Sequence, residues 1–190
     1  MSSSDARRVA FLGGGKMGEA LISGLIRSGG RTIDEIMVTN RREERARELA
    51  GKYGITATLD NPEAVRWADV LVLMTKPQDI EALLEQIREH VQPHDTVISF
   101  AAGVRTSFVE KQLPDGVPVV RVMSNVPVMV DEAMSVISAG RSADERHLAV
   151  AEELLVRRAP RCCGCPSSIS TPSRRRAAAG RRTSSCWPRR

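Results

Sequence analysis

The sequence predicts an α/β domain with a doubly wound, mostly parallel sheet, followed by a basic tail that we expect to be disordered. Short apolar runs alternate with amphipathic helical segments over residues 8–155, as expected when helices cover both faces of a parallel sheet. A glycine cluster directly follows the first apolar run. The composition changes abruptly after Val156, beyond which there is no acidic residue and arginine is frequent.

The expected strands are short apolar runs bounded by turn residues, a pattern typical of strands buried on both faces. They are residues 8–12, 35–40, 55–58, 69–74, 96–100, 117–123 and 133–138. The expected helices fall between them and show apolar residues at helical spacing or a charged face. They are residues 19–28, 41–52, 62–67, 80–87 and a last segment that opens at Ser142. Glu145 stands three residues after Ser142, which is the spacing of a capping box.

The first apolar run, the glycine cluster and the next helix follow the order strand, turn, helix, and a second strand comes after them. The glycines have the spacing G-x-G-x-x-G, in which Gly13 suits a tight turn, Gly15 a close approach of a diphosphate and Gly18 close helix packing. The amides that open the helix would hold the diphosphate. A plain structural turn is the alternative, but the context favours a Rossmann-like dinucleotide site made of Gly13, Gly14, Gly15, Lys16, Met17 and Gly18.

The end of the second strand distinguishes between the two nicotinamide cofactors. An NAD site usually has a carboxylate there, whereas this chain has Asn40 followed by Arg41 and Arg42. Asn40 can donate a hydrogen bond, and a guanidinium from either arginine can pair with a 2′-phosphate. The sequence therefore predicts NADP (NADPH) as the cofactor. The alternative is that the two arginines only begin a solvated, charged helix.

Composition and charge exclude several other functions. The chain has 190 residues, and its 3% aromatic content argues against a base-stacking surface. No apolar run approaches the roughly 18 residues of a membrane span, and the N-terminus lacks the apolar segment of a signal peptide. The net charge of +5 comes from ten arginines in residues 157–190, which leave 18 basic and 23 acidic residues in 1–156. We expect no membrane partner, no specific nucleic-acid partner and a cytoplasmic location.

Neither a metal site nor a catalytic triad is expected. His90, His94 and His147 lack ligand spacing, and we expect them to be solvated surface residues. Cys162 and Cys165 form a C-x-x-C pair, but neither a second pair nor a histidine is near them in the sequence. This suits hydride transfer, because the cofactor carries the reactive electrons and the protein supplies mainly orientation. Catalytic residues remain unassigned.

Several linked motifs resemble those of pyrroline-5-carboxylate reductases over about residues 9–155. They are F-L-G-G-G-K-M-G-E-A at 11–20, G-L at 24–25, K-P-Q at 76–78, Ser99 with A-A-G at 101–103, and R-V-M-S-N-V-P at 121–127. The resemblance implies NADPH-dependent reduction of a small cyclic imine carboxylate, 1-pyrroline-5-carboxylate, to proline.

The same resemblance assigns residues at the carboxyl ends of the strands, where ligands bind in such sheets. It places the cofactor phosphates at residues 13–18 and Asn40. It places Asn61, Thr75, Lys76 and Ala102 along the adenosine and nicotinamide ends, and Asn125 to Pro127 beside the reacting ring. Position alone leaves structural alternatives open: Lys76 as a surface charge, residues 101–103 as a packing contact and Asn125 as a helix cap.

Two departures from the family pattern bear on activity. The family reads M-P-N-T-P where this chain has Ser124 and Val126, and the loss of a hydroxyl near the nicotinamide would reduce activity. The family also continues into a helical domain that forms the dimer and holds the substrate carboxylate in an S-G-S-G-P-A-Y segment. Nothing from Arg157 onward resembles it. We therefore expect a dinucleotide-binding domain at 1–156, an arginine-rich tail at 157–190, loss of the family's homo-oligomer interface and little or no turnover.

A shifted reading frame explains the composition of the tail. If each codon is read from the preceding third base, the codons from Ser170 permit L-D-A-V-T-A-x-S-G-S-G-P-A-Y-F-F-L-L-A-E-A, which is the family's missing sequence. Trp187 and Pro188 with either cysteine codon at 186 dictate L-A. The alternative is a basic segment selected to bind nucleic acid. Two other functional hypotheses are a non-catalytic NADP-binding fragment or pseudogene product, and a related reductase such as a deazaflavin:NADP oxidoreductase.

Overall fold

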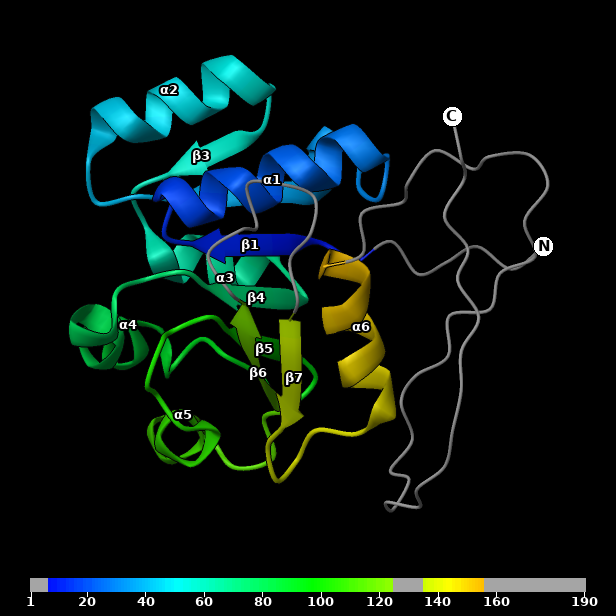
Figure 1. Cartoon of the computed structure of the whole chain (residues 1–190). Coiled ribbons are helices and arrows are strands. Elements are labelled where there is room, and N and C mark those ends of the chain that lie inside the picture. The colour runs from blue at the N-terminus through cyan, green and yellow to red at the C-terminus, as the bar shows by residue number, and fades with distance from the viewer. Residues whose placement is uncertain (1–6, 125–134, 156–190) are drawn as a thin grey trace, which may run out of the picture. The chain divides into compact units, whose positions relative to one another are not determined.

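The computed structural model describes residues 7–124 and 135–155, and the rest of the chain is drawn as a grey trace (Figure 1). The predicted arginine-rich tail, all four cysteines, Asn125, Val126 and Pro127 lie outside the described residues. Within the described ranges, no helix is long and apolar enough to cross a membrane.

The described strands form one sheet in the order β3-β2-β1-β4-β5-β6-β7. Neighbouring strands from β3 to β6 are parallel, and β7 is antiparallel to β6 at the edge. The strands are β1 (Val9–Leu12), β2 (Ile36–Thr39), β3 (Thr56–Thr58), β4 (Val70–Leu73), β5 (Thr96–Ser99), β6 (Val119–Ser124) and β7 (Ser135–Ala139). This order, which reverses direction at β1, confirms the doubly wound, mostly parallel, Rossmann-like sheet.

Helices cover both faces of the sheet, which is why its central strands β1 and β4 are apolar at every position. Val9 and Phe11 of β1 pack into the apolar cluster that includes residues of α1, α2 and α6. Ala10 and Leu12 point to the opposite cluster, which includes residues of α3, α4 and α5. Figure 1 shows these helices around the sheet: α1 (Lys16–Ser28), α2 (Glu43–Tyr53), α3 (Asn61–Trp67), α4 (Ile80–Ile87), α5 (Thr106–Gln112) and α6 (Glu145–Leu155).

Three helical features differ from the sequence prediction. Helix α1 begins at Lys16 rather than Glu19, because the glycine turn runs directly into it. Helix α5 was not expected, since its short polar sequence buries only Val109. Helix α6 begins after Asp144, whose Oδ1 accepts hydrogen bonds from the amides of Arg146 (2.9 Å) and His147 (3.3 Å). The predicted capping box at Ser142 is therefore wrong, because Asp144 caps the helix instead.

Candidate functional site

A pocket of about 510 Å³ opens at the carboxyl ends of β1, β2 and β4. The three strands are in parallel register, so that Leu12 lies beside both Thr39 and Leu73. The loops that follow these strands therefore meet at one edge of the sheet, where ligands bind in doubly wound folds. Nine residues that the sequence singled out line this pocket: Gly13, Gly14, Gly15, Asn40, Arg41, Arg42, Asn61, Thr75 and Lys76.

The glycine turn is hydrogen-bonded to the end of β2 and packs against the segment that follows β4. The amides of Gly13 and Gly14 donate to the carbonyl of Thr39 at 3.2 and 2.9 Å. Gly13 has φ +118°, and a Cβ added there would lie 2.9 Å from the carbonyl oxygen of Met74. A Cβ on Gly18 would lie 2.5 Å from the carbonyl oxygen of Gly13. The backbone itself therefore requires glycine at these two positions.

Gly15 has a different environment, which suits a bound diphosphate. It is the N-cap of α1, in extended conformation (φ −74°, ψ −173°), and no side chain caps the helix. A Cβ added to Gly15 would meet no atom within 4 Å, although the residue lines the pocket. The first amides of a helix need acceptors from outside the helix, and a phosphate oxygen is a favourable one. Open space beside uncapped amides thus fits the diphosphate of a dinucleotide.

A cluster of charged residues on α1 and α2, which the sequence analysis did not predict, contacts the glycine turn. Arg45 Nε donates to the carbonyl oxygen of Gly14 (3.2 Å), and Arg45 Nη2 pairs with Glu19 Oε2 on α1 (2.5 Å). Glu19 Oε1 also accepts from Lys52 Nζ (2.7 Å) and from Tyr53 Oη (2.9 Å). The hydrogen bonds from Lys52 and Arg45 lower the pKa of Glu19 from 4.5 to about 2. This cluster holds α2, α1 and the turn together.

Arg41 and Asn40 follow β2 and border the pocket. The Arg41 guanidinium makes two hydrogen bonds to Asp79, Nη1 to Oδ1 at 3.3 Å and Nη2 to Oδ2 at 3.0 Å. Asn40 Oδ1 accepts from the amide of Arg42, the N-cap residue of α2. The Arg41 side chain is 80% exposed, so a ligand in the pocket can reach it.

Asn61 and Thr75 are two polar residues that line the pocket. Asn61 Oδ1 accepts from Thr39 Oγ1 (2.6 Å), and its Nδ2 donates to Gln86 Oε1 (2.9 Å). These two bonds fix the amide group. Thr75 Oγ1 is buried and has no hydrogen-bond partner among the described residues. A buried hydroxyl without a partner is costly, and a ligand in this pocket would supply one.

Four other predicted residues lie away from the pocket lining. Lys16 and Met17 are exposed on the first turn of α1, and Gly18 is buried beneath the glycine turn. Ala102 is exposed in the turn after β5. In the described part of the chain, no group of three His, Cys, Asp or Glu side chains is placed to hold a metal ion.

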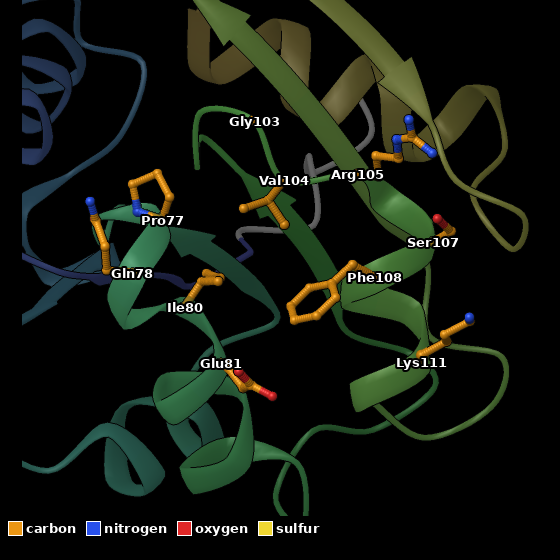
Figure 2. Close-up of a pocket in the computed structure, with 10 residues that line it drawn as sticks. All are labelled: Pro77, Gln78, Ile80, Glu81, Gly103, Val104, Arg105, Ser107, Phe108 and Lys111. Atoms are coloured by element: carbon orange, nitrogen blue, oxygen red, sulfur yellow. The ribbon is translucent and has the colours of Figure 1, made fainter.

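A second pocket, of about 520 Å³, lies between the 3-10 turn η2 (Pro77–Asp79), the start of α4 and the start of α5. Figure 2 shows the Phe108 ring pointing toward Ile80, with Val104 beside them. Pro77 and Gln78 line this pocket, whereas Asp79 lines the first pocket, at the carboxyl ends of β1, β2 and β4. The turn η2 therefore contributes to both.

The sheet order and the glycine turn at the reversal of strand order define a Rossmann-type domain of the dinucleotide-binding class. The chain belongs to the family described as NADP oxidoreductase, coenzyme F420-dependent, whose family model matches residues 8–103.

Individual relatives are more specific than the family description. The chain is 40% identical over 168 residues to pyrroline-5-carboxylate reductase 1 of Bacillus subtilis, covering 88% of this chain and 54% of the relative. It is 41% identical over 150 residues to the pyrroline-5-carboxylate reductase of Corynebacterium melassecola, covering 77% and 55%. The solved structure of the Coxiella burnetii pyrroline-5-carboxylate reductase matches with a TM-score of 0.75 and 31% identity, covering 80% and 56%. The chain thus spans about half the length of the relatives it matches.

Proposed function

We propose that the domain binds NADP(H) in the pocket at the carboxyl edge of the sheet. The diphosphate lies on the glycine turn, residues 13–18, and the 2′-phosphate lies near Asn40 and Arg41. Asn61, Thr75 and Lys76 line the bound cofactor, while Ala102, Asn125 and Pro127 belong to its nicotinamide end. The observation that carries the proposal is the open space beside Gly15 at the uncapped start of α1. The family description, an NADP oxidoreductase, supports the choice of cofactor.

The activity that this binding would serve is reduction of the C=N bond of 1-pyrroline-5-carboxylate to give proline. The names of the curated relatives support this substrate. When bound, NADPH supplies the hydride. The residues of this chain bind the cofactor, keep the adenosine half in place and fix the turn that carries the diphosphate. We expect low turnover, because residues 157–190 do not contain the S-G-S-G-P-A-Y segment that the resemblance assigns to the substrate carboxylate.

The test has two parts, both performed on the full chain. Fluorescence titration with NADPH should give saturable binding, and NADPH oxidation with pyrroline-5-carboxylate should be far slower than with a full-length homologue. If the folded protein does not bind NADPH at millimolar concentration, the cofactor assignment is contradicted. Turnover near that of the homologue would contradict only the expected loss of activity.

Thr75 provides a second test of the cofactor site. We expect Thr75→Val to leave the stability of the free protein unchanged or to raise it by about 1 kcal/mol, because it removes an unpartnered buried hydroxyl. The same change should weaken NADPH binding about tenfold if the bound cofactor is the missing partner, since tenfold corresponds to roughly 1.4 kcal/mol. Thermal unfolding and NADPH titration measure the two effects. Thr56→Val is the control, because Thr56 is exposed on β3 outside the pocket; equal affinity losses in both variants would contradict the assignment.

Coenzyme F420 defines a second candidate function, since the family description names it. In that case the chain would transfer hydride between NADP(H) and a deazaflavin. Oxidation of NADPH by F420 in the absence of pyrroline-5-carboxylate would favour this function. The names of the relatives at 40% and 41% identity favour the imine substrate.

The tail and the assembly state form a separate part of the proposal. We expect a domain boundary near residue 156 and a frameshift near codon 155. We also expect a cytoplasmic location, loss of the family's homo-oligomer interface and no specific binding of nucleic acid. Resequencing the gene through codon 155 tests the frameshift, and an intact frame would contradict it. Light scattering tests whether the family's homo-oligomer interface is lost, and salt-dependent DNA binding tests the basic segment as a polyanion-binding element.

A further inference from the structure

The Arg41 to Asp79 ion pair joins two separate loops at the dinucleotide pocket. Arg41 follows β2, while Asp79 ends the turn η2 that follows β4. The two side chains meet through two hydrogen bonds, of 3.0 and 3.3 Å, and both residues line the pocket. The two terminal nitrogens of the guanidinium, Nη1 and Nη2, each donate to one carboxylate oxygen. Two oxygens of a phosphate can accept from the same pair of nitrogens.

Asp79 differs in charge from the other ionisable residues of this pocket. Among the described lining residues it is the one carboxylate, and the cations are Arg41, Arg42 and Lys76. A phosphate that pairs with Arg41 must share the guanidinium with Asp79 or displace it. A nearby carboxylate also repels a phosphate dianion. The Arg41 side chain is 80% exposed, so the ion pair is weak enough for a phosphate to displace it.

We propose that Asp79 is a specificity-determining residue that limits the preference of this site for NADPH over NADH. This inference rests on the proposed cofactor site. In the free protein the carboxylate of Asp79 forms an ion pair with the guanidinium of Arg41. A dinucleotide with a 2′-phosphate exchanges with that carboxylate, whereas a dinucleotide without one binds with the ion pair intact. The cost of the exchange therefore falls on NADPH alone.

The variant Asp79→Asn keeps the shape of the side chain and removes its charge. We expect its Kd for NADPH to fall about 3- to 5-fold, the upper end of one exposed charge interaction, with the Kd for NADH changed less than about 2-fold. Both constants are measured by fluorescence titration at low ionic strength, and added salt should reduce the gain. Asp79→Ala, which has no amide to donate, should show the same direction.

Two controls isolate the mechanism. Glu81→Gln removes a carboxylate two residues along the chain that lines the second pocket but not the dinucleotide pocket, and should leave the ratio of the two Kd values unchanged. In an Arg41→Ala background, Asp79→Asn should lose most of its effect, because the two residues act through one contact. Equal changes for both nucleotides, or weaker NADPH binding in both Asp79 variants, would overturn the inference. If the wild-type protein binds neither nucleotide, the proposed function itself fails.

Discussion

Replacing Gly15 with aspartate is expected to lower NADPH affinity at least about 100-fold, a loss of roughly 2.7 kcal/mol, while leaving the fold intact. The side chain would enter the open space of the pocket, where a Cβ meets no atom within 4 Å. Its carboxylate would occupy the proposed position of the diphosphate and repel it. The carboxylate would also accept hydrogen bonds from the first amides of α1. Aspartate is a favourable N-cap in this extended conformation, so stability should change by only about 0.5 kcal/mol.

A large loss of NADPH affinity with little change in stability makes this result specific. Titration with NADPH and thermal unfolding of the same samples measure both. Gly51→Ala is the matched control, because a Cβ at this α2 position also meets no atom within 4 Å but Gly51 does not line the pocket. NADPH binding by the Gly15→Asp protein within about threefold of wild type, a difference of only ~0.7 kcal/mol, would show that the diphosphate does not lie on this turn.

Glu19→Gln is expected to lower the free energy of unfolding by about 2 kcal/mol at neutral pH. The Glu19 carboxylate is 20% exposed and accepts from Arg45, Lys52 and Tyr53. A shift of its pKa from 4.5 to about 2 corresponds to at most ~3.4 kcal/mol, which partial exposure to solvent reduces. Urea unfolding measures the change. Because Arg45 also holds the Gly14 carbonyl, NADPH affinity should fall a few-fold as well.

The contribution of Glu19 should depend on pH in a defined direction. Because folding lowers the pKa of this carboxyl, its stabilisation is complete above 4.5 and is lost as the pH falls through about 2. The difference between wild type and Glu19→Gln should therefore shrink between pH 5 and pH 3. Glu43→Gln is the control: Glu43 and Arg47 form an exposed pair, and its loss should have a much smaller effect. A difference that stays constant down to pH 3 would contradict the role of the charge cluster.

Local sequence carries the information for the strands and the glycine turn. Each strand from β1 to β6 was predicted to within about two residues. The signal is clearest for β1 and β4, because strands covered on both faces are apolar along their length. The glycine turn could be predicted because backbone geometry restricts Gly13 and Gly18 to glycine. Helix α5 could not, because its few apolar residues become buried only against α4 and β6.

The polar side of the pocket depends on contacts between residues far apart in the chain. Arg45 lies 31 residues from Gly14, and Asp79 lies 38 residues from Arg41. Nothing in the sequence around Arg45 or Asp79 distinguishes these residues from ordinary charged surface residues. The first turn of α1 does contain an acidic residue, Glu19, but its three partners come from α2, and only the packing of the two helices shows them.

By itself, the sequence determined the doubly wound fold and the position of the dinucleotide site, because both follow from the periodicity of apolar residues and from a short glycine motif. The tertiary structure alone decided which charges surround the site: Arg45 against Gly14, Glu19 at the centre of three donors, and Asp79 on Arg41. The physical reason is that hydrophobic burial repeats along the chain, whereas an ion pair forms only where folding brings two distant side chains within a few ångströms.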